Sequence, residues 1–227
     1  MAVPGQAGTL DLFADHPLAA KELRIEPLAD GAVVLRGFAA ETAETLWREI
    51  GHVIEAAPLR HLVTPGGLRM SVAMTNCGER GWVSDRTGYR YAAVDPDSGR
   101  PWPAMPASLR GLAQAAAASG GFAGFQPDAC LINRYDAGTR LSLHQDRDEA
   151  DFAQPIVSVS LGLPAVFLLG GLKRNDRTLR VPLSHGDVVV WGGPSRLRFH
   201  GVLALKEGWH PLTAGCRLNL TFRRALP

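Results

Sequence analysis

A histidine and an aspartate two residues apart, His144 and Asp146, occur in the segment LSLHQD. Residues two apart on a β-strand point to the same face, so we expect the imidazole and the carboxylate to project together. A second histidine, His200, lies near the end of another expected strand, RLRFHGV. Two histidines and one carboxylate form a ligand set that binds non-haem Fe(II) and leaves positions open for a co-substrate and O₂. The sequence therefore predicts an iron site.

Two alternatives stay open for this pattern. A His-x-Asp pair taken alone also suits a solvated strand face. The segment His185-Gly186-Asp187 has the same spacing, but its glycine indicates a turn, where side chains do not share a strand face. The remaining histidines fall on expected loops, on the first expected helix or just beyond it: His16, His52, His61 and His210.

The last expected strand, CRLNLTFR, alternates strictly between polar and apolar residues. Its polar face carries Arg217, Asn219, Thr221 and Arg223. Arginines on such a face suit the carboxylates of a small diacid such as 2-oxoglutarate, through charge-assisted hydrogen bonds. A solvated face at a sheet edge is the alternative. The segment ACLINRY presents a similar set, Leu131, Asn133 and Tyr135, which we expect to complete the same pocket.

These residues must be positioned by an α+β fold. Apolar residues at helical spacing predict a helix over 41–57, and an alanine-rich helix is expected over 107–118. MSVAMT is an expected strand within a segment, 64–103, that is otherwise loop or hairpin. From residue 128 onward, short β-forming segments separated by turns predict a β-sandwich or jelly roll with helices on one side. They are ACLINRY, RLSLHQD, IVSVSLG, AVFLLG, RTLRVPL, DVVVWGG, RLRFHGV and CRLNLTFR.

Length and composition indicate one compact domain. The chain has 227 residues, 46% of them apolar, which is enough for a substantial core. Its three cysteines are odd in number and far apart, which argues against a disulfide framework or a cysteine zinc site. No signal sequence or long apolar run is evident. We therefore expect a cytoplasmic protein that is neither secreted nor membrane-spanning.

The charge is unevenly distributed. Residues 1–60 carry 5 basic and 9 acidic side chains, against 19 and 13 in the remainder, and the formal net charge is +2. Arginine accounts for 21 of the 24 basic residues, and it suits planar recognition of carboxylate or phosphate. A coding bias toward arginine is an equal alternative. The charge alone leaves nucleic-acid binding undecided.

Taken together, these residues resemble the bacterial AlkB family of Fe(II)- and 2-oxoglutarate-dependent dioxygenases, which reverse alkylation damage in nucleic acids. The resemblance covers nearly the whole chain after the first ten residues. It rests on His-x-Asp, the later histidine and Arg-x-Asn-x-x-x-Arg. The similar segments are LDLFAD, PGG, MSVAMTNCG, RPWPAMP, FQPDACLINRY, LSLHQDRDE, PIVSVSLGLPAVF, GGLKRND, HGDVVVWGG and CRLNLTFR.

The resemblance implies a fold and a set of site residues. It implies one domain over 1–227, with an N-terminal extension, supporting helices and a nucleotide-recognition lid over about 1–125. A double-stranded β-helix, or jelly roll, follows over about 126–227. The implied iron ligands are His144, Asp146 and His200. The implied 2-oxoglutarate residues are Asn133, Arg134, Tyr135, Arg217, Asn219 and Arg223. The implied substrate residues are Thr64, Met74, Trp82, Tyr89, Arg90, Tyr91, Asp148 and Arg174.

The resemblance also implies a reaction. Fe(II), O₂ and 2-oxoglutarate would demethylate bases such as 1-methyladenine and 3-methylcytosine in DNA and RNA, and release succinate, CO₂ and formaldehyde. The methyl lies on the Watson–Crick edge, so the base must be flipped out or single-stranded. Trp82 and the ring of His144 are the expected stacking surfaces, with ordinary packing as the alternative for Trp82. We expect alkylated DNA and RNA as partners of a monomer that needs no protein partner.

Two rival functions use the same residues. One is a 2-oxoglutarate-dependent hydroxylase of a small molecule or a protein side chain, and the other is a non-catalytic cupin-like binding protein. The glycine- and aromatic-rich segment from Thr64 to Tyr91 favours a nucleic-acid substrate, because it offers stacking groups on a lid. The complete set of iron ligands and arginines argues against the binding protein.

Overall fold

The computed structural model describes residues 24–227, so the LDLFAD segment, His16 and the N-terminal extension lie outside the described range. Strands dominate this part of the chain, and two α-helices and one 3-10 helix accompany them. In chain order the elements are β1 (Arg24–Ala29), β2 (Ala32–Arg36), α1 (Ala43–Ala56), β3 (Ala73–Gly78), β4 (Gly81–Asp85), β5 (Gly88–Ala92), α2 (Ala107–Ser119), β6 (Ala129–Tyr135), β7 (Leu141–His144), β8 (Ile156–Gly162), β9 (Ala165–Leu169), β10 (Leu179–Leu183), β11 (Val188–Trp191), η1 (Gly193–Ser195), β12 (His200–Val202) and β13 (Arg217–Arg223).

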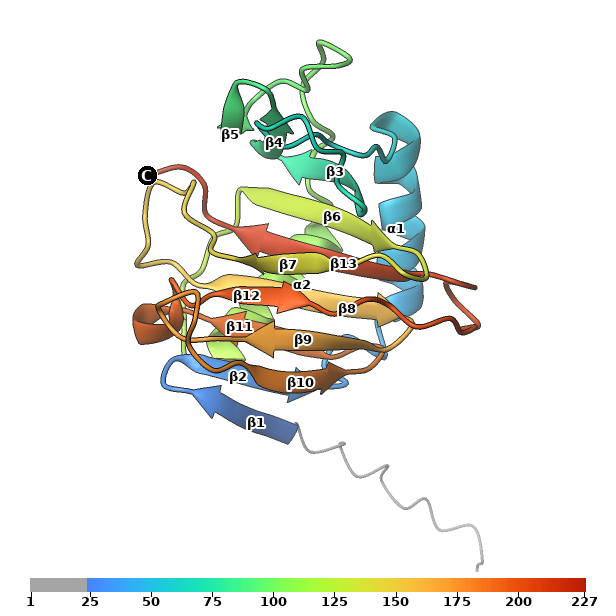
Figure 1. The fold of residues 1–227 in the computed structure, drawn as a ribbon. Helices are drawn as coiled ribbons and strands as arrows, with labels where there is room; N and C mark the ends of the chain where they lie inside the picture. Colours follow the sequence, from blue (N-terminus) through green and yellow to red (C-terminus); the bar gives the residue numbers. More distant parts are fainter. Residues whose placement is uncertain (1–23) are drawn as a thin grey trace, which may run out of the picture.

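Two antiparallel sheets face each other, and the two α-helices cover the outer face of the larger one (Figure 1). The larger sheet has the strand order β1-β2-β11-β8-β13-β6-β3, and the smaller has the order β10-β9-β12-β7. A separate hairpin, β4-β5, stands next to β3 at one end of the molecule (Figure 1). This arrangement confirms the predicted jelly roll with helices on one side.

One core lies between the helices and the larger sheet. In β13, Leu218, Leu220 and Phe222 point to this side, as the alternation of the strand predicts. They pack with Leu46 of α1 and Leu109 of α2, all of them buried. The same alternation turns the polar residues of β13 toward the space between the two sheets.

The second core lies between the sheets. Trp191 of β11 and Phe167 of β9 meet there with their ring centroids 5.8 Å apart, among buried aliphatic residues of both sheets. This core fills only part of the space, because β8 contributes Ser158 and Ser160 to the same face and β13 contributes arginines. The candidate site lies in the polar part of the space between the two sheets.

The hairpin β1-β2 is not among the predicted elements. It extends the larger sheet beyond β11 and closes with a two-residue turn, Asp30-Gly31, in which Gly31 has a φ of 71°. Asp-Gly between two apolar segments is a strong hairpin signal because the turn requires positive φ. The sequence therefore contained the information for this hairpin. The β4-β5 hairpin, by contrast, falls in the segment expected to be loop or hairpin.

Two further findings concern membrane spanning and the cysteines. Among residues 24–227, no helix has the length and apolar character needed to cross a membrane. Cys77, Cys130 and Cys216 are buried and have free thiols.

Candidate metal centre and substrate cavity

A cavity of about 850 Å³ opens between the two sheets and extends to the β4-β5 hairpin. Most residues predicted for the site line it, although they come from strands and loops far apart in the sequence. They are Thr64, Met74, Trp82, Tyr89, Asn133, Tyr135, His144, Asp146, Asp148, Arg174, His200, Arg217, Asn219 and Arg223.

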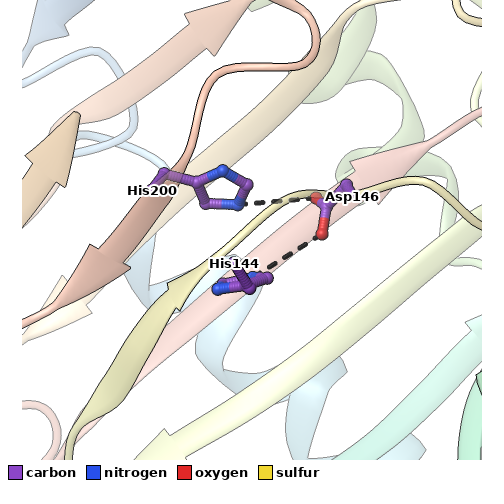
Figure 2. A group of neighbouring side chains, drawn as sticks. All are labelled: His144, Asp146 and His200. Atoms are coloured by element: carbon purple, nitrogen blue, oxygen red, sulfur yellow. Dashed lines mark ion pairs between the residues drawn. The ribbon is translucent and has the colours of Figure 1, made fainter. Parts of the chain in front are cut away.

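The predicted metal ligands converge at one point on the cavity wall (Figure 2). Nε2 of His144 lies 3.6 Å from Oδ1 of Asp146, and Nε2 of His200 lies 3.7 Å from Oδ2 of Asp146. One donor atom from each residue falls within 4.8 Å of the others. No other group of three His, Cys, Asp or Glu side chains in the described range has this geometry.

Strand pairing brings the two histidines together. His200 on β12 is directly opposite His144 on β7, and Val202 is opposite Leu141, so β7 carries one extra residue at this point. Such a bulge re-aims side chains at the end of a strand. Gly201 permits the close approach of the strands, because a Cβ there would lie 2.7 Å from the carbonyl oxygen of Leu141. Asp146 lies just beyond the end of β7.

Backbone hydrogen bonds orient both imidazoles. Nδ1 of His144 contacts the carbonyl oxygen of Ser142 at 2.9 Å, and Nδ1 of His200 contacts that of Arg198 at 3.1 Å. A carbonyl only accepts, so Nδ1 carries the proton in each ring and Nε2 presents its lone pair toward Asp146. This is the tautomer that a metal-binding histidine needs, held by a neighbouring backbone group.

The charges around the three residues favour a carboxylate and a neutral imidazole. Burial opposes ionisation of Asp146, but Arg223 and the two histidines outweigh it and lower the pKa of this carboxyl. Burial and the neighbouring His144 lower the pKa of His200 to about 4. Both residues are therefore ready to bind a cation at neutral pH. The donor set, two imidazole nitrogens and a carboxylate open to a cavity, fits Fe(II).

A second polar pocket surrounds Arg217, which is buried on β13. Its Nη2 donates to Oγ of Ser160 at 2.9 Å, and its guanidinium stacks on Tyr135 at 4.9 Å from the ring centroid. Its Nε and Nη1 have no hydrogen-bond partner among the described residues. Buried donors are rarely left unpaired, so this arrangement fits a carboxylate ligand such as one end of 2-oxoglutarate. Burial also lowers the pKa of Arg217 below its usual value.

Amide and hydroxyl groups form the floor beside Arg217. Nδ2 of Asn219 donates to Oγ of Ser158 at 2.8 Å, and Oδ1 of Asn219 accepts from Thr221 at 3.0 Å. Asn133 is 3.4 Å from the same oxygen, and its own Oδ1 has no partner within residues 24–227. Ser158 and Ser160 are not predicted site residues. Their spacing in IVSVSLG places both on one face of β8, where Ser160 pairs with Asn219 and Ser158 pairs with Thr221 of the neighbouring strand β13.

The β4-β5 hairpin brings an aromatic pair to the cavity. Trp82 and Tyr89 stack with their ring centroids 5.5 Å apart and an interplanar angle of 13°. The indole Nε1 of Trp82 donates to Oδ2 of Asp148 at 2.7 Å. Arg174, which also lines the cavity, donates to the carbonyl oxygen of Leu143 at 2.8 Å. Aromatic faces and a carboxylate therefore share the cavity with the metal ligands.

Three predicted residues do not reach the cavity, and two of them point to the wrong strand face. Arg134 lies between Asn133 and Tyr135 on β6, so it points away from them and pairs with Asp136 on the exposed side. Arg90 likewise lies on the hairpin face opposite Tyr89 and pairs with Asp85. Neither arginine lines the cavity, so the binding roles expected for Arg90 and Arg134 stay predictions.

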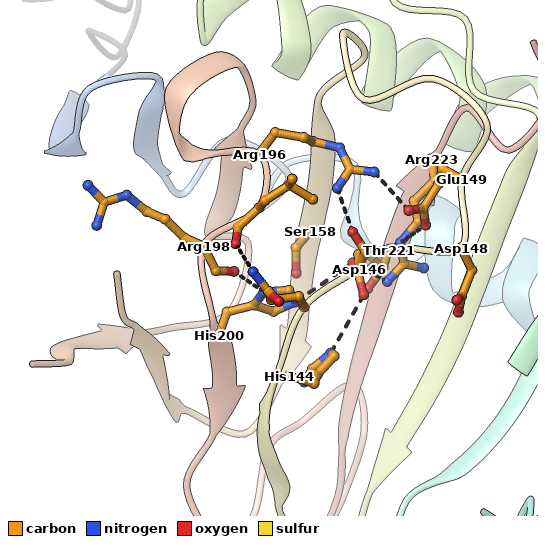
Figure 3. A network of polar contacts seen from close by, with 12 residues as sticks. His144, Asp146, Asp148, Glu149, Ser158, Arg196, Arg198, His200, Thr221 and Arg223 are labelled. Atoms are coloured by element: carbon orange, nitrogen blue, oxygen red, sulfur yellow. Dashed lines mark hydrogen bonds and ion pairs between the residues drawn. The ribbon is translucent and has the colours of Figure 1, made fainter. Parts of the chain in front are cut away.

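Tyr91 shares the hairpin face of Trp82 but is directed elsewhere. Its hydroxyl donates to Oε1 of Glu149 at 2.7 Å, behind the cavity wall. Glu149 and its partner Arg196 belong to a buried polar network around Asp146 (Figure 3). Neither residue was predicted, because no strand or helix period links them to the metal ligands.

The alternative His-x-Asp pair has a structural role. Asp187 accepts hydrogen bonds from Arg36 and from the backbone of Gly37 and Ser184, and so closes a turn. His185 accepts a hydrogen bond from the backbone of Gly162 through Nδ1 and lies outside the cavity. The turn interpretation of this segment is therefore confirmed.

Two facing sheets with a His-Asp-His group and a buried arginine between them define a jelly-roll metal centre with an anion pocket. The family model described as the 2OG-Fe(II) oxygenase superfamily matches residues 31–223. The chain therefore belongs to the 2OG-Fe(II) oxygenase superfamily, for which Fe(II) and 2-oxoglutarate are the cofactor and co-substrate.

Individual relatives agree with this assignment. The chain is 61% identical over 216 residues to the alpha-ketoglutarate-dependent dioxygenase AlkB of Escherichia coli, covering 95% of this chain and 98% of the relative. It is 41% identical over 98 residues to the nucleic acid dioxygenase ALKBH1 of Mus musculus, covering 43% and 25% respectively. A solved structure described as that of OsALKBH1 aligns with a TM-score of 0.78 and 29% identity, over 88% of this chain and 100% of that one.

Proposed function

We propose that this protein is a 2-oxoglutarate-dependent dioxygenase that removes alkyl groups from nucleic-acid bases, with 1-methyladenine and 3-methylcytosine in DNA and RNA as substrates. The observation that carries the proposal is the stacked pair Trp82 and Tyr89 in the same cavity as the metal ligands. Similarity to the Escherichia coli dioxygenase AlkB and to a nucleic acid dioxygenase supports it.

The chain's own residues would hold the cofactor and co-substrate. His144, Asp146 and His200 would bind Fe(II), and Arg217 would pair with a carboxylate of 2-oxoglutarate through its two free nitrogens. When bound, Fe(II) and 2-oxoglutarate supply the oxidation, in which O₂ and 2-oxoglutarate give succinate and CO₂ while the N-methyl group is hydroxylated. Loss of the hydroxymethyl group as formaldehyde restores the base.

Asn133, Tyr135 and Asn219 would shape the co-substrate pocket next to Arg217. All are buried and line the cavity. Burial raises the pKa of Tyr135 above its usual value, so its phenol stays neutral beside the arginine. Arg223 contacts Asp146 with two nitrogens and would fix the metal carboxylate as well as add positive charge for the dianionic co-substrate.

Residues of the hairpin and the metal-binding loop would recognise the base. A methyl on the Watson–Crick edge is hidden in a duplex, so the base must leave the stack. Trp82 offers one aromatic face, and the ring of His144 offers another surface within the cavity. The carboxylate of Asp148 would favour a methylated, positively charged base over a neutral one, because it supplies the opposite charge. Thr64, Met74 and Arg174 would complete the wall.

We also propose a monomeric enzyme with one domain, as expected for 1–227, because one chain supplies every site residue named here, all of them within residues 24–227. A nucleic-acid substrate and three free cysteines fit a cytoplasmic location.

The experiment that tests the proposal uses protein loaded with Fe(II) in the presence of 2-oxoglutarate and O₂. Oligonucleotides with one 1-methyladenine, and the same oligonucleotides unmethylated, would be compared for succinate and formaldehyde. The proposal predicts equal amounts of both products with the methylated strand only. Succinate without formaldehyde would indicate a different substrate, such as a small molecule or a protein side chain. No succinate despite bound Fe(II) would contradict an enzymatic role.

A further inference from the structure

A cluster of two carboxylates and two guanidinium groups adjoins the metal ligands and includes one of them, Asp146 (Figure 3). Its members are Asp146, Glu149, Arg196 and Arg223. Glu149 and Arg196 are 6% and 2% exposed, and neither lines the cavity. Neither side chain is part of the cavity wall in this structure. Buried charges are costly unless they are paired, so the burial of Glu149 and Arg196 calls for a structural or functional reason.

Arg196 joins Glu149 to the backbone at the metal ligand. Its Nη2 pairs with Oε2 of Glu149 at 2.9 Å, and its Nη1 donates to the carbonyl oxygen of Asp146 at 3.0 Å. Its Nε donates to the carbonyl oxygen of Gln154 at 3.0 Å. One guanidinium therefore fixes the loop between β7 and β8 at two backbone points.

Arg223 joins the same Glu149 to the side chain of the metal ligand. Its Nε and Nη2 lie 2.9 and 2.6 Å from Oδ2 of Asp146, and its Nε is 3.3 Å from Oε1 of Glu149. Glu149 thus contacts both arginines, one of which holds the backbone of Asp146 and the other its carboxylate. Both arginines therefore restrain Asp146.

The β4-β5 hairpin reaches the same glutamate. The hydroxyl of Tyr91 donates to Oε1 of Glu149 at 2.7 Å. Burial raises the pKa of Tyr91 well above its usual value, which keeps the phenol protonated and able to donate. Tyr91 is directly opposite Trp82 in the hairpin, so this bond restrains the strand pair that carries the aromatic surface.

We propose that Glu149 is a positioning residue that fixes the metal ligand Asp146 through Arg196 and Arg223, and fixes the β4-β5 hairpin over the cavity through Tyr91. The part that concerns the hairpin rests on the proposed nucleic-acid substrate. The part that concerns Asp146 does not, because it requires only that the three ligands bind a divalent cation.

The first experiment titrates the protein with Mn(II) alone and follows the free ion by electron paramagnetic resonance. Glu149→Gln keeps the size of the side chain and an acceptor for Tyr91 but removes the charge that holds both arginines. We expect Mn(II) to bind at least tenfold more weakly, in the range typical for residues that orient metal ligands. Asp187→Asn is the matched control, a buried carboxylate paired with Arg36 away from the cavity, and its Mn(II) affinity should stay within twofold.

Circular dichroism would check that each variant is folded. If Glu149→Gln does not fold, Glu149→Gln/Arg196→Gln removes both charges of the pair together and replaces it in the titration. A loss of affinity smaller than tenfold in the folded variant would overturn the positioning role. An equal loss in Asp187→Asn would do the same, because it would show a general effect of removing a buried charge.

The second experiment tests the hairpin with Tyr91→Phe, which removes only the hydroxyl. We expect KM for the methylated oligonucleotide to rise at least fivefold, with kcat and Mn(II) affinity within twofold of the parent. Ser84→Ala is the control, since it removes a hydrogen bond of 2.6 Å from the same hairpin to the carbonyl oxygen of Val63. Its KM should stay within twofold.

An unchanged KM in Tyr91→Phe, or an equal rise in both variants, would overturn the restraint of the hairpin through Glu149. Absence of any turnover of methylated oligonucleotides by the parent protein would contradict the proposed function instead. The Mn(II) titration would still decide the positioning of Asp146 in that case, because it contains no nucleic acid.

Discussion

The indole nitrogen of Trp82 donates a hydrogen bond to Asp148, which lies two residues beyond the metal ligand Asp146. The contact ties the β4-β5 hairpin to the metal-binding loop at the cavity. It also fixes the ring plane of Trp82, whose neighbour Tyr89 stacks against it. An aromatic surface with a set orientation costs less entropy when a base stacks on it, because less side-chain freedom is lost on binding.

Trp82→Ala should weaken binding of a methylated oligonucleotide by about 1–3 kcal/mol, the usual contribution of an aromatic side chain that stacks on a base. Mn(II) affinity should not change, because Trp82 contacts no metal ligand. Trp82→Phe keeps a stacking ring but loses the bond to Asp148, and its effect should be intermediate. KM measurements and a Mn(II) titration check both variants. If Trp82→Ala unfolds the protein, Trp82 is mainly a packing residue.

Asp148→Asn should reduce the preference for methylated over unmethylated bases by about tenfold, the effect of about 1.4 kcal/mol. The substitution keeps the shape of the side chain and an acceptor for Trp82. It removes the negative charge that attracts the positively charged methylated base. Competition between methylated and unmethylated oligonucleotides measures the preference. Asp151→Asn, in the same loop but outside the cavity, is the control for net charge. Equal losses in the two variants would indicate general electrostatics and not recognition by Asp148.

His144→Ala should abolish turnover and the gain in thermal stability that a divalent cation provides. A ligand that binds only the folded state raises Tm, so Mn(II) should stabilise the parent protein but not this variant. Thermal unfolding with and without Mn(II) measures the difference. His185→Ala, which alters the other His-x-Asp pair, should keep the Mn(II) effect. Retention of that effect in His144→Ala would place the cation elsewhere.

Strand alternation accounts for much of what the sequence predicted about the site, such as Arg217 sharing one face of β13 with Arg223. The short His-x-Asp spacing brought His144 and Asp146 together, although β7 ends at His144 and Asp146 lies just beyond it. The same rule places Arg134 on the other face of β6, since a residue between Asn133 and Tyr135 must point away from both. Its expected role in 2-oxoglutarate binding is therefore the least supported of the set and stays a prediction.

Contacts made by loops could not be predicted in this way. Glu149 follows the metal-binding strand without periodicity, and its partner Arg196 lies in a connection after β11. Their meeting depends on how two irregular segments pack on the finished sheets. The direction of Tyr91 follows from that same packing, because its acceptor is Glu149. Hairpin β1-β2 differs, since its Asp-Gly turn was visible in the sequence.

Arg217→Met should separate co-substrate binding from stability. The free Nε and Nη1 of Arg217 would each bind a carboxylate oxygen, and hydrogen bonds to charged groups contribute about 1.5–3 kcal/mol, so the KM for 2-oxoglutarate should rise at least tenfold. Arg217→Lys keeps the charge without the planar pair of donors, so its KM for 2-oxoglutarate should lie between those of the parent and Arg217→Met. Succinate formation at varied 2-oxoglutarate concentration measures both variants, and Arg177→Met, at an exposed position, is the control.

The protein without cofactors should tolerate the same change. Burial lowers the pKa of Arg217, which means that its charge is poorly solvated there, and two of its donors are unpaired within the described chain. Removing a buried charge that has no ion-pair partner also removes the cost of its desolvation. Thermal unfolding of metal-free Arg217→Met should therefore give a Tm equal to or above that of the parent. A large fall in Tm together with an unchanged KM would make Arg217 a structural residue and remove the arginine from the co-substrate pocket.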